Sequence, residues 1–230
     1  MRPTTLNLIA ITIFVLTMSS LLGPLIHLSP VVPAIVVAGM LGIATLDTLG
    51  WQGRGGNLLI DWLAGADAKY RDRILKHEAG HFLVAYLLDV PILSYTLTAW
   101  EAFKQGIPGV GGVIFDCQEL EQELAQGKLS TQLLNRYCQV WMAGVAAEAL
   151  TYGSAAGGAD DRQKIRTLWL QLQKPLAECQ LKQSWSALQA RNLLQTHQEA
   201  YAALVTSMQN RASVAECYQV IEQSKTTTDC

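Results

Sequence analysis

Apolar residues dominate the start of the chain. Residues 6–28 and 31–49 form two nearly uncharged runs, separated by a short joint around Ser29 and Pro30. Each run approaches the roughly 20 residues with which a helix crosses a bilayer. We therefore predict two transmembrane helices, joined as a tight hairpin, within residues 1–50. The alternatives are a cleaved signal peptide for the first run, and a buried core helix or a re-entrant segment for the second.

Beyond this region the pattern becomes one of mixed apolar and polar positions. Residues 51–66 are glycine-rich at their start and are predicted to be a linker, and residues 67–230 are predicted to form one domain. Apolar residues then recur at steps of three and four, which predicts a helix from about Asp67 to Leu88, before Pro91. They are Ile74, Leu75, Phe82, Leu83 and Tyr86.

Strand and helix signals alternate in the rest of the domain. Residues 92–99 and 110–115 are rich in strand-forming residues. Helices are predicted from a cap at Ser130 to about Thr151, from about Asp161 to Leu172, and as a pair within residues 181–223 that packs on the domain or mediates oligomerisation. The expected fold class is therefore mainly α, an α+β domain with a small β-hairpin behind a transmembrane helical hairpin.

Charge distribution gives the orientation and excludes one class of partner. Arg2 is the only Lys or Arg before Arg54, and the turn between the apolar runs carries neither residue. By the positive-inside rule both flanks, and so the domain, face the cytoplasm. The net charge of -2 and the absence of any Lys/Arg-rich run give no support for nucleic acid as a partner.

The cysteines indicate no structural chemistry. There are five, an odd number, and no C-x-x-C pair occurs. This is neither a disulfide framework nor a zinc ribbon, so we expect reduced and mostly buried thiols.

A metal-binding motif lies in the first predicted helix of the domain, as His77-Glu78-Ala79-Gly80-His81. Residues four apart share one helix face, so His77 and His81 can direct both imidazoles at one ion. Glu78 lies beside the first ligand, where a general base is needed. H-E-x-x-H therefore predicts a zinc hydrolase site with one Zn²⁺ per chain. The alternatives are a surface helix that carries two histidines by chance and a site that binds zinc without turnover.

The third ligand is not fixed by spacing. The metzincin extension fails, because Val84 and Leu87 stand where Gly and His are required. His27 lies in the first apolar run and His197 in a late helix, so a carboxylate is expected. The candidates are Glu101, Glu119, Glu148, Asp160 and Asp161. A glycine-rich loop before the last two favours Asp160 or Asp161, although an Asp at that place is equally suited to capping the helix.

Three blocks in order resemble the peptidase domain of FtsH-type membrane proteases. They are HEAGHFLVAYLL, AGVAAEALTYG at residues 143–153 and GGADD at residues 157–161. The resemblance covers roughly residues 68–223 and implies a helical, zincin-type domain. It implies that Asp161 is the third zinc ligand and that Glu148 is a partner of a ligand histidine, the alternative being an exposed helix glutamate. It also implies that the VGGVIF strand borders the site and pairs with an extended substrate, unless it is an internal hairpin strand.

The chain departs from that family in one respect. No G-x-x-x-x-G-K-[ST] phosphate loop occurs, and only about twenty residues separate Leu49 from Lys69, so the ATPase module is missing. The chain is similar to short ATPase-less relatives of cyanobacteria and plastids, which implies a plasma or thylakoid membrane protein. The partners expected are a protein or peptide substrate, the lipid bilayer, and a homo-oligomer or an FtsH-type ATPase.

The expected function is that of a membrane-anchored zinc metalloendopeptidase, which hydrolyses peptide bonds of membrane or unfolded proteins with a zinc-bound water that Glu78 activates. One alternative is a weak or inactive adaptor of full FtsH complexes. Another is a site-2-type intramembrane protease, which is disfavoured because Lys69, Arg71 and Arg73 precede the motif and are costly to bury in a bilayer.

Overall fold

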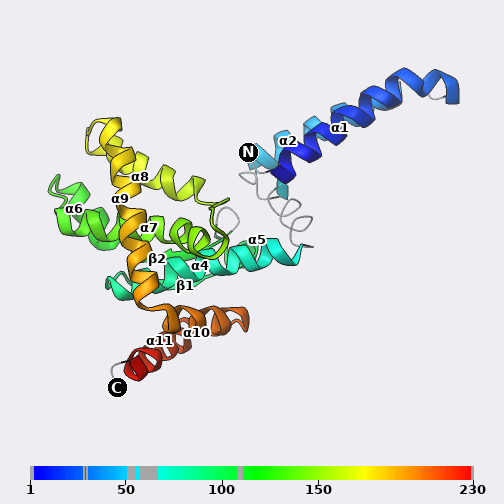
Figure 1. Cartoon of the computed structure of the whole chain (residues 1–230). Helices are drawn as coiled ribbons and strands as arrows, with labels where there is room; N and C mark the ends of the chain where they lie inside the picture. Colours follow the sequence, from blue (N-terminus) through cyan, green and yellow to red (C-terminus); the bar gives the residue numbers. More distant parts are fainter. Residues whose placement is uncertain are drawn as a thin grey trace. The chain divides into compact units, whose positions relative to one another are not determined.

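The computed structural model describes residues 3–27, 29, 31–50, 55–56, 67–107 and 111–228. Within these residues the protein is mainly helical, with ten α-helices and one two-stranded antiparallel sheet (Figure 1). The chain divides into two compact units. One contains Met1–Ala68 and Thr98–Gly111, and the other contains Lys69–Leu97 and Gly112–Cys230. Most of the predicted linker, residues 51–66, lies outside the described residues.

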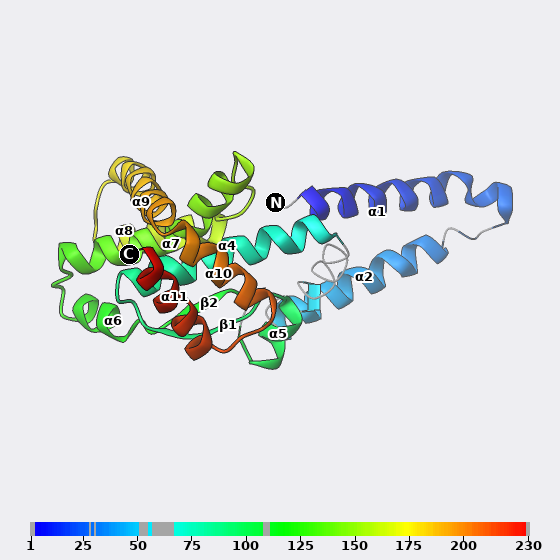
Figure 2. The same ribbon diagram turned by 60° about the horizontal axis from the view of Figure 1, so that its bottom comes forward.

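The first unit contains the apolar hairpin. Helix α1 (Pro3–Leu22) leads through a 3-10 turn, η1 (Gly23–Ile26), into α2 (Val31–Gly50), which runs back beside it (Figure 2). The apolar side chains on both helices are largely exposed. Among the described residues, only Val31–Gly50 is long and apolar enough to cross a membrane, and the apolar part of α1, Ile9–Leu22, is shorter. Such a helix near the N-terminus is typical of a membrane anchor and also of a signal sequence.

A short helix, α5 (Ala99–Lys104), belongs to the same unit and was not predicted. The strand expected over residues 92–99 ends earlier, at Tyr95. Thr98 is the reason, because its side chain accepts a hydrogen bond from the Glu101 N–H and caps the helix. A local side-chain cap thus replaces the strand that the Thr-rich composition favoured.

The second unit is built around two long helices. Helix α4 (Ala68–Leu87) carries the H-E-x-x-H motif, and α7 (Thr131–Tyr152) is buried along most of its length. Both agree with the predicted helices, and Ser130 caps α7 as expected, with its hydroxyl accepting from the Leu133 N–H at 3.2 Å. Phe82 and Leu83 on α4 and Cys138 and Val140 on α7 are fully buried in the core between the helices.

The small sheet pairs β1 (Ile92–Tyr95) with β2 (Val113–Phe115). The register is irregular between Ile92 and Ser94. Helix α6 (Gln118–Ala125), which was not predicted, follows β2, and α8 (Ala159–Gln171) follows the glycine-rich loop as predicted. The remaining chain forms three helices rather than the expected pair: α9 (Leu176–Thr196), α10 (Gln198–Gln209) and α11 (Val214–Thr228).

The late helices pack on the domain. α9 lies along α7, and α11 contacts β1, where the Tyr218 hydroxyl accepts a hydrogen bond from the Ile92 N–H at 3.3 Å. Leu204, Met208 and Ile221 are fully buried. The predicted packing of the late helices on the domain is therefore confirmed. Leu194 is also buried, whereas Leu188 is 54% exposed. Figure 2 brings α10 and α11 to the front.

Candidate metal centre

Three buried side chains converge where α4, α7 and α8 meet. His77 and His81 project from α4, and Asp161 projects from the first turn of α8. Their exposed fractions are 9%, 4% and 6%. These are the ligands predicted from the sequence, and they form the one group of at least three His, Cys, Asp or Glu side chains suited to a metal ion among the described residues. Asp160, the alternative, is exposed on the same turn.

The spacing of the ligand atoms fits a tetrahedral ion. His77 Nε2 lies 3.1 Å from His81 Nε2 and 3.3 Å from Asp161 Oδ2, and His81 Nε2 lies 3.4 Å from Asp161 Oδ2. Ligand bonds of about 2.0–2.1 Å at tetrahedral angles place neighbouring ligand atoms about 3.4 Å apart. Two imidazoles and one carboxylate are also a donor set that Zn²⁺ favours in hydrolases. The residues present therefore fit a zinc ion.

Each histidine is held in the tautomer that metal binding requires. His81 Nδ1 lies 2.7 Å from the Val140 carbonyl oxygen, which can only accept, so Nδ1 carries the proton. His77 Nδ1 lies 2.7 Å from Glu148 Oε1 and donates to that carboxylate in the same way. Both Nε2 atoms are then available to a metal.

Glu148 joins two parts of the site. It is 1% exposed on α7 and binds His77 with one oxygen. Its Oε2 accepts from Arg73 Nη1 at 2.8 Å and from the Ala156 N–H at 2.8 Å, so the same carboxylate holds the loop that leads to Asp161. The structure thus places Glu148 beside a ligand histidine, as the resemblance implied, and excludes the alternative of an exposed helix residue.

The two buried carboxylates and His77 shift one another's pKa values. Burial raises the pKa of Glu148, but hydrogen bonds from His77, the Ala156 N–H and Arg73 outweigh it and lower that pKa to about 2. Burial lowers the pKa of His77, yet its bonds to Asp161 and Glu148 raise it to about 10. Burial likewise raises the pKa of Asp161, but the two histidines and Lys164 bring it well below its usual range. The buried carboxylates are therefore ionised and paired with His77, Arg73 and Lys164, and a metal ion would bind by displacing a proton from His77.

Gly144 on α7 allows the two histidines to sit side by side. A Cβ at this position would lie 2.3 Å from His77 Nε2 and 2.5 Å from His81 Nε2. Neither ring can move far, because each Nδ1 is held by a hydrogen bond. Sequence reasoning did not single out this residue, although the small-residue segment AGVAAEA that contains it was the available signal.

The expected general base, Glu78, is held by the sheet. Its Oε2 accepts a hydrogen bond from the Val113 N–H, the first residue of β2, at 3.0 Å. Gly112 precedes that residue with φ +135°, a conformation that side chains rarely adopt, and a Cβ there would lie 3.2 Å from the same oxygen. The strand predicted to border the site therefore contacts its glutamate directly.

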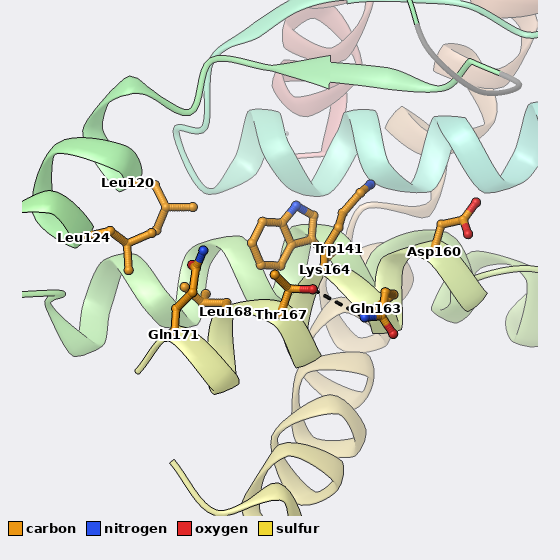
Figure 3. Close-up of a pocket in the computed structure, with 9 residues that line it drawn as sticks. All are labelled: Leu120, Leu124, Trp141, Asp160, Gln163, Lys164, Thr167, Leu168 and Gln171. Carbon is orange, nitrogen blue, oxygen red and sulfur yellow. Dashed lines mark hydrogen bonds between the residues drawn. The ribbon is translucent and has the colours of Figure 1, made fainter. Parts of the chain in front are cut away.

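A groove of about 440 Å³ lies between α6, α7 and α8 (Figure 3). Leu120, Leu124, Trp141 and Leu168 contribute apolar surface, and Asp160, Gln163, Lys164, Thr167 and Gln171 contribute polar groups. Lys164 lines the groove and donates to Asp161 Oδ1 at 3.0 Å, so it connects the groove to the metal centre.

The remaining candidates lie elsewhere. Glu101 belongs to α5, and Glu119 is exposed on α6. His197 is at the junction of α9 and α10. Of the carboxylates weighed from the sequence, the structure brings Asp161 into the ligand group and Glu148 behind it.

A scan of family models and a search of curated proteins found no match to this chain. The three sequence blocks and the geometry of this centre are accordingly the observations that bear on its function.

Proposed function

We propose that this protein is a membrane-anchored zinc metalloendopeptidase, similar to the peptidase domain of FtsH-type proteases and without an ATPase module of its own. One observation carries the proposal: His77, His81 and Asp161 form a buried triangle of ligand atoms with edges of 3.1–3.4 Å. Glu78, next to the first ligand, completes the set of groups that metal-assisted amide hydrolysis requires.

A bound zinc ion would supply Lewis acidity, polarising a peptide carbonyl and making water more acidic. His77, His81 and Asp161 would hold the ion. Glu78 would accept the proton of the attacking water and pass it to the leaving amine. The Val113 N–H fixes one oxygen of Glu78 and thereby orients the carboxylate for this transfer.

The surroundings support a polypeptide as the substrate. Strand β2 begins beside Glu78, so an extended chain that runs along β2 would pass the reacting groups. The apolar part of the groove beside Lys164 suits an apolar substrate side chain. The helix with the ligands, α4, is not the candidate membrane span, which supports a site outside the bilayer rather than a site-2-type arrangement.

The test uses the purified full-length chain and casein as an unfolded reporter. Glu78→Gln is expected to retain zinc and to abolish cleavage, because the glutamine cannot accept the proton. Unchanged cleavage by this variant would exclude the assigned role. A wild-type chain that holds zinc and cleaves no unfolded reporter would instead indicate the adaptor function.

A further inference from the structure

Helix α5 exposes its aromatic side chains and buries its alanines. Trp100 and Phe103 are 54% and 46% exposed, whereas Ala99 and Ala102 are 2% and 0% exposed. Trp100, Phe103 and Lys104 are spaced three and four residues apart and therefore share one face. Helices on water-facing surfaces normally bury their aromatics and expose smaller or polar residues. This arrangement indicates an apolar surrounding for the aromatic face.

The aromatic face is preassembled. The rings of Trp100 and Phe103 are stacked, with centroids 5.8 Å apart and planes 17° apart, and Lys104 Nζ lies 5.3 Å from the Trp100 ring centroid. The helix is fixed by the Thr98 cap, and the Ile107 N–H donates to the Ala102 carbonyl oxygen at 2.9 Å beyond its end. A rigid pair of aromatics with an adjacent lysine is the composition found where proteins meet the membrane–water interface.

The unit that contains α5 points to a bilayer as the cover of this face. Thr98–Gly111 belongs to the same compact unit as the apolar helices α1 and α2, although it lies between two strands of the other unit in sequence. The described part of that unit is therefore dominated by exposed apolar side chains. A bilayer that receives α2 is the surface available to α5 as well.

We propose that α5 is a membrane-interface contact, with Trp100 and Phe103 inserted at the headgroup boundary and Lys104 directed toward lipid phosphates. The proposal rests on α2 being the membrane anchor of the proposed function. It also defines the substrate class. Eight residues lie between Lys104 and Val113, a span of at most about 30 Å. Because this short connection joins α5 to Val113, the residue that binds Glu78, the substrates expected are polypeptide segments close to a bilayer.

The contact is tested with the full-length chain in vesicles of phosphatidylcholine and phosphatidylglycerol, with or without brominated acyl chains that quench tryptophan fluorescence. Trp100→Gln is expected to reduce the fluorescence amplitude that the brominated lipid quenches. Trp185→Gln is the matched control, because Trp185 is also exposed, at 42%, and has Lys182 over its ring, but lies on α9 in the other unit. This control is expected to leave the quenched amplitude unchanged.

Two results would overturn the contact. One is an equal quenched amplitude in Trp100→Gln and in the wild type. The other is a wild-type chain that does not float with the vesicles and whose fluorescence the brominated lipid does not quench. The first result would assign the aromatic face to a protein partner. The second would show that α2 does not anchor the chain in a membrane. None of these measurements depends on peptidase activity, so a failure of the contact is distinguishable from a failure of the proposed chemistry.

The substrate class is tested separately with a lipid-tethered peptide reporter whose cleavable bond lies about ten residues from the bilayer. The double variant Trp100→Gln/Phe103→Gln is expected to cut this reporter several-fold more slowly and to cut soluble casein at the wild-type rate. Equal loss on both reporters, or no loss on either, would overturn the role of α5 in substrate choice.

Discussion

Glu148 Oε1 lies 2.7 Å from His77 Nδ1, and the other oxygen of the same carboxylate holds the loop before Asp161. One buried side chain thereby supports a metal ligand on α4 and the approach to a metal ligand on α8. Its removal should affect both.

The first prediction concerns metal affinity. Glu148→Gln should weaken zinc binding by roughly 10–100-fold, because an amide supports the proton on His77 Nδ1 less well and cannot pair with Arg73. Competition with a chromophoric chelator measures the change. Glu119→Gln, on the exposed face of α6, is the matched control and should bind zinc like the wild type. Equal affinity of both variants would contradict the role of Glu148.

The second prediction concerns acid stability. The pKa of Glu148 is lowered from 4.5 to about 2 in the fold. A depressed pKa contributes stability that is present above pH 4.5 and is lost as the pH falls toward 2. In the presence of a chelator, urea unfolding should show Glu148→Gln less stable than wild type at pH 6, and the difference should shrink by pH 3. A difference independent of pH would indicate packing instead.

Asp161 and Asp160 form a natural matched pair for the third prediction. Asp161 lies among the ligands and is 6% exposed, whereas Asp160 beside it is exposed to solvent. Asp161→Ala should lose zinc after gel filtration, because one of the three ligands is removed, and Asp160→Ala should retain about one equivalent. Metal analysis of both purified variants is sufficient. Loss in Asp160→Ala alone would reverse the assignment.

Gly144 provides a steric test of the same centre. In Gly144→Ala the new methyl group would lie 2.3 Å from His77 Nε2, within the space between the ligand atoms. We expect zinc binding to be abolished while the helical circular dichroism remains. Gly127→Ala is the control, because a Cβ there meets nothing within 4 Å despite φ +67°. Zinc binding by Gly144→Ala at the wild-type level would show that the ion does not lie between the histidines.

Replacing Gly112 tests turnover separately from metal binding. A Cβ at this position approaches Glu78 Oε2 at 3.2 Å, and φ +135° is strained for alanine. Gly112→Ala should therefore disturb the Val113–Glu78 contact, lower kcat on casein about ten-fold and leave zinc content unchanged. Gly127→Ala again serves as the control. A loss of zinc in Gly112→Ala would mean that the strand supports the ligands rather than Glu78.

Several features followed from the sequence because they depend on local chemistry. Helix α4 and the shared face of His77 and His81 follow from residue spacing. Helix α7 with its Ser130 cap and helix α8 after the glycine-rich loop were predicted for the same reason. The exposed apolar helix Val31–Gly50 is equally a matter of composition.

Other features required the tertiary structure. Spacing along the chain left Asp160 and Asp161 undecided, since adjacent residues of a helix point about 100° apart and only packing selects the inward one. The contacts of Glu148 with His77 and of Val113 with Glu78 join segments 71 and 35 residues apart. The Thr98 cap that creates α5 ended a strand that composition favoured. Sequence determined which groups are present, and long-range packing decided which of them meet.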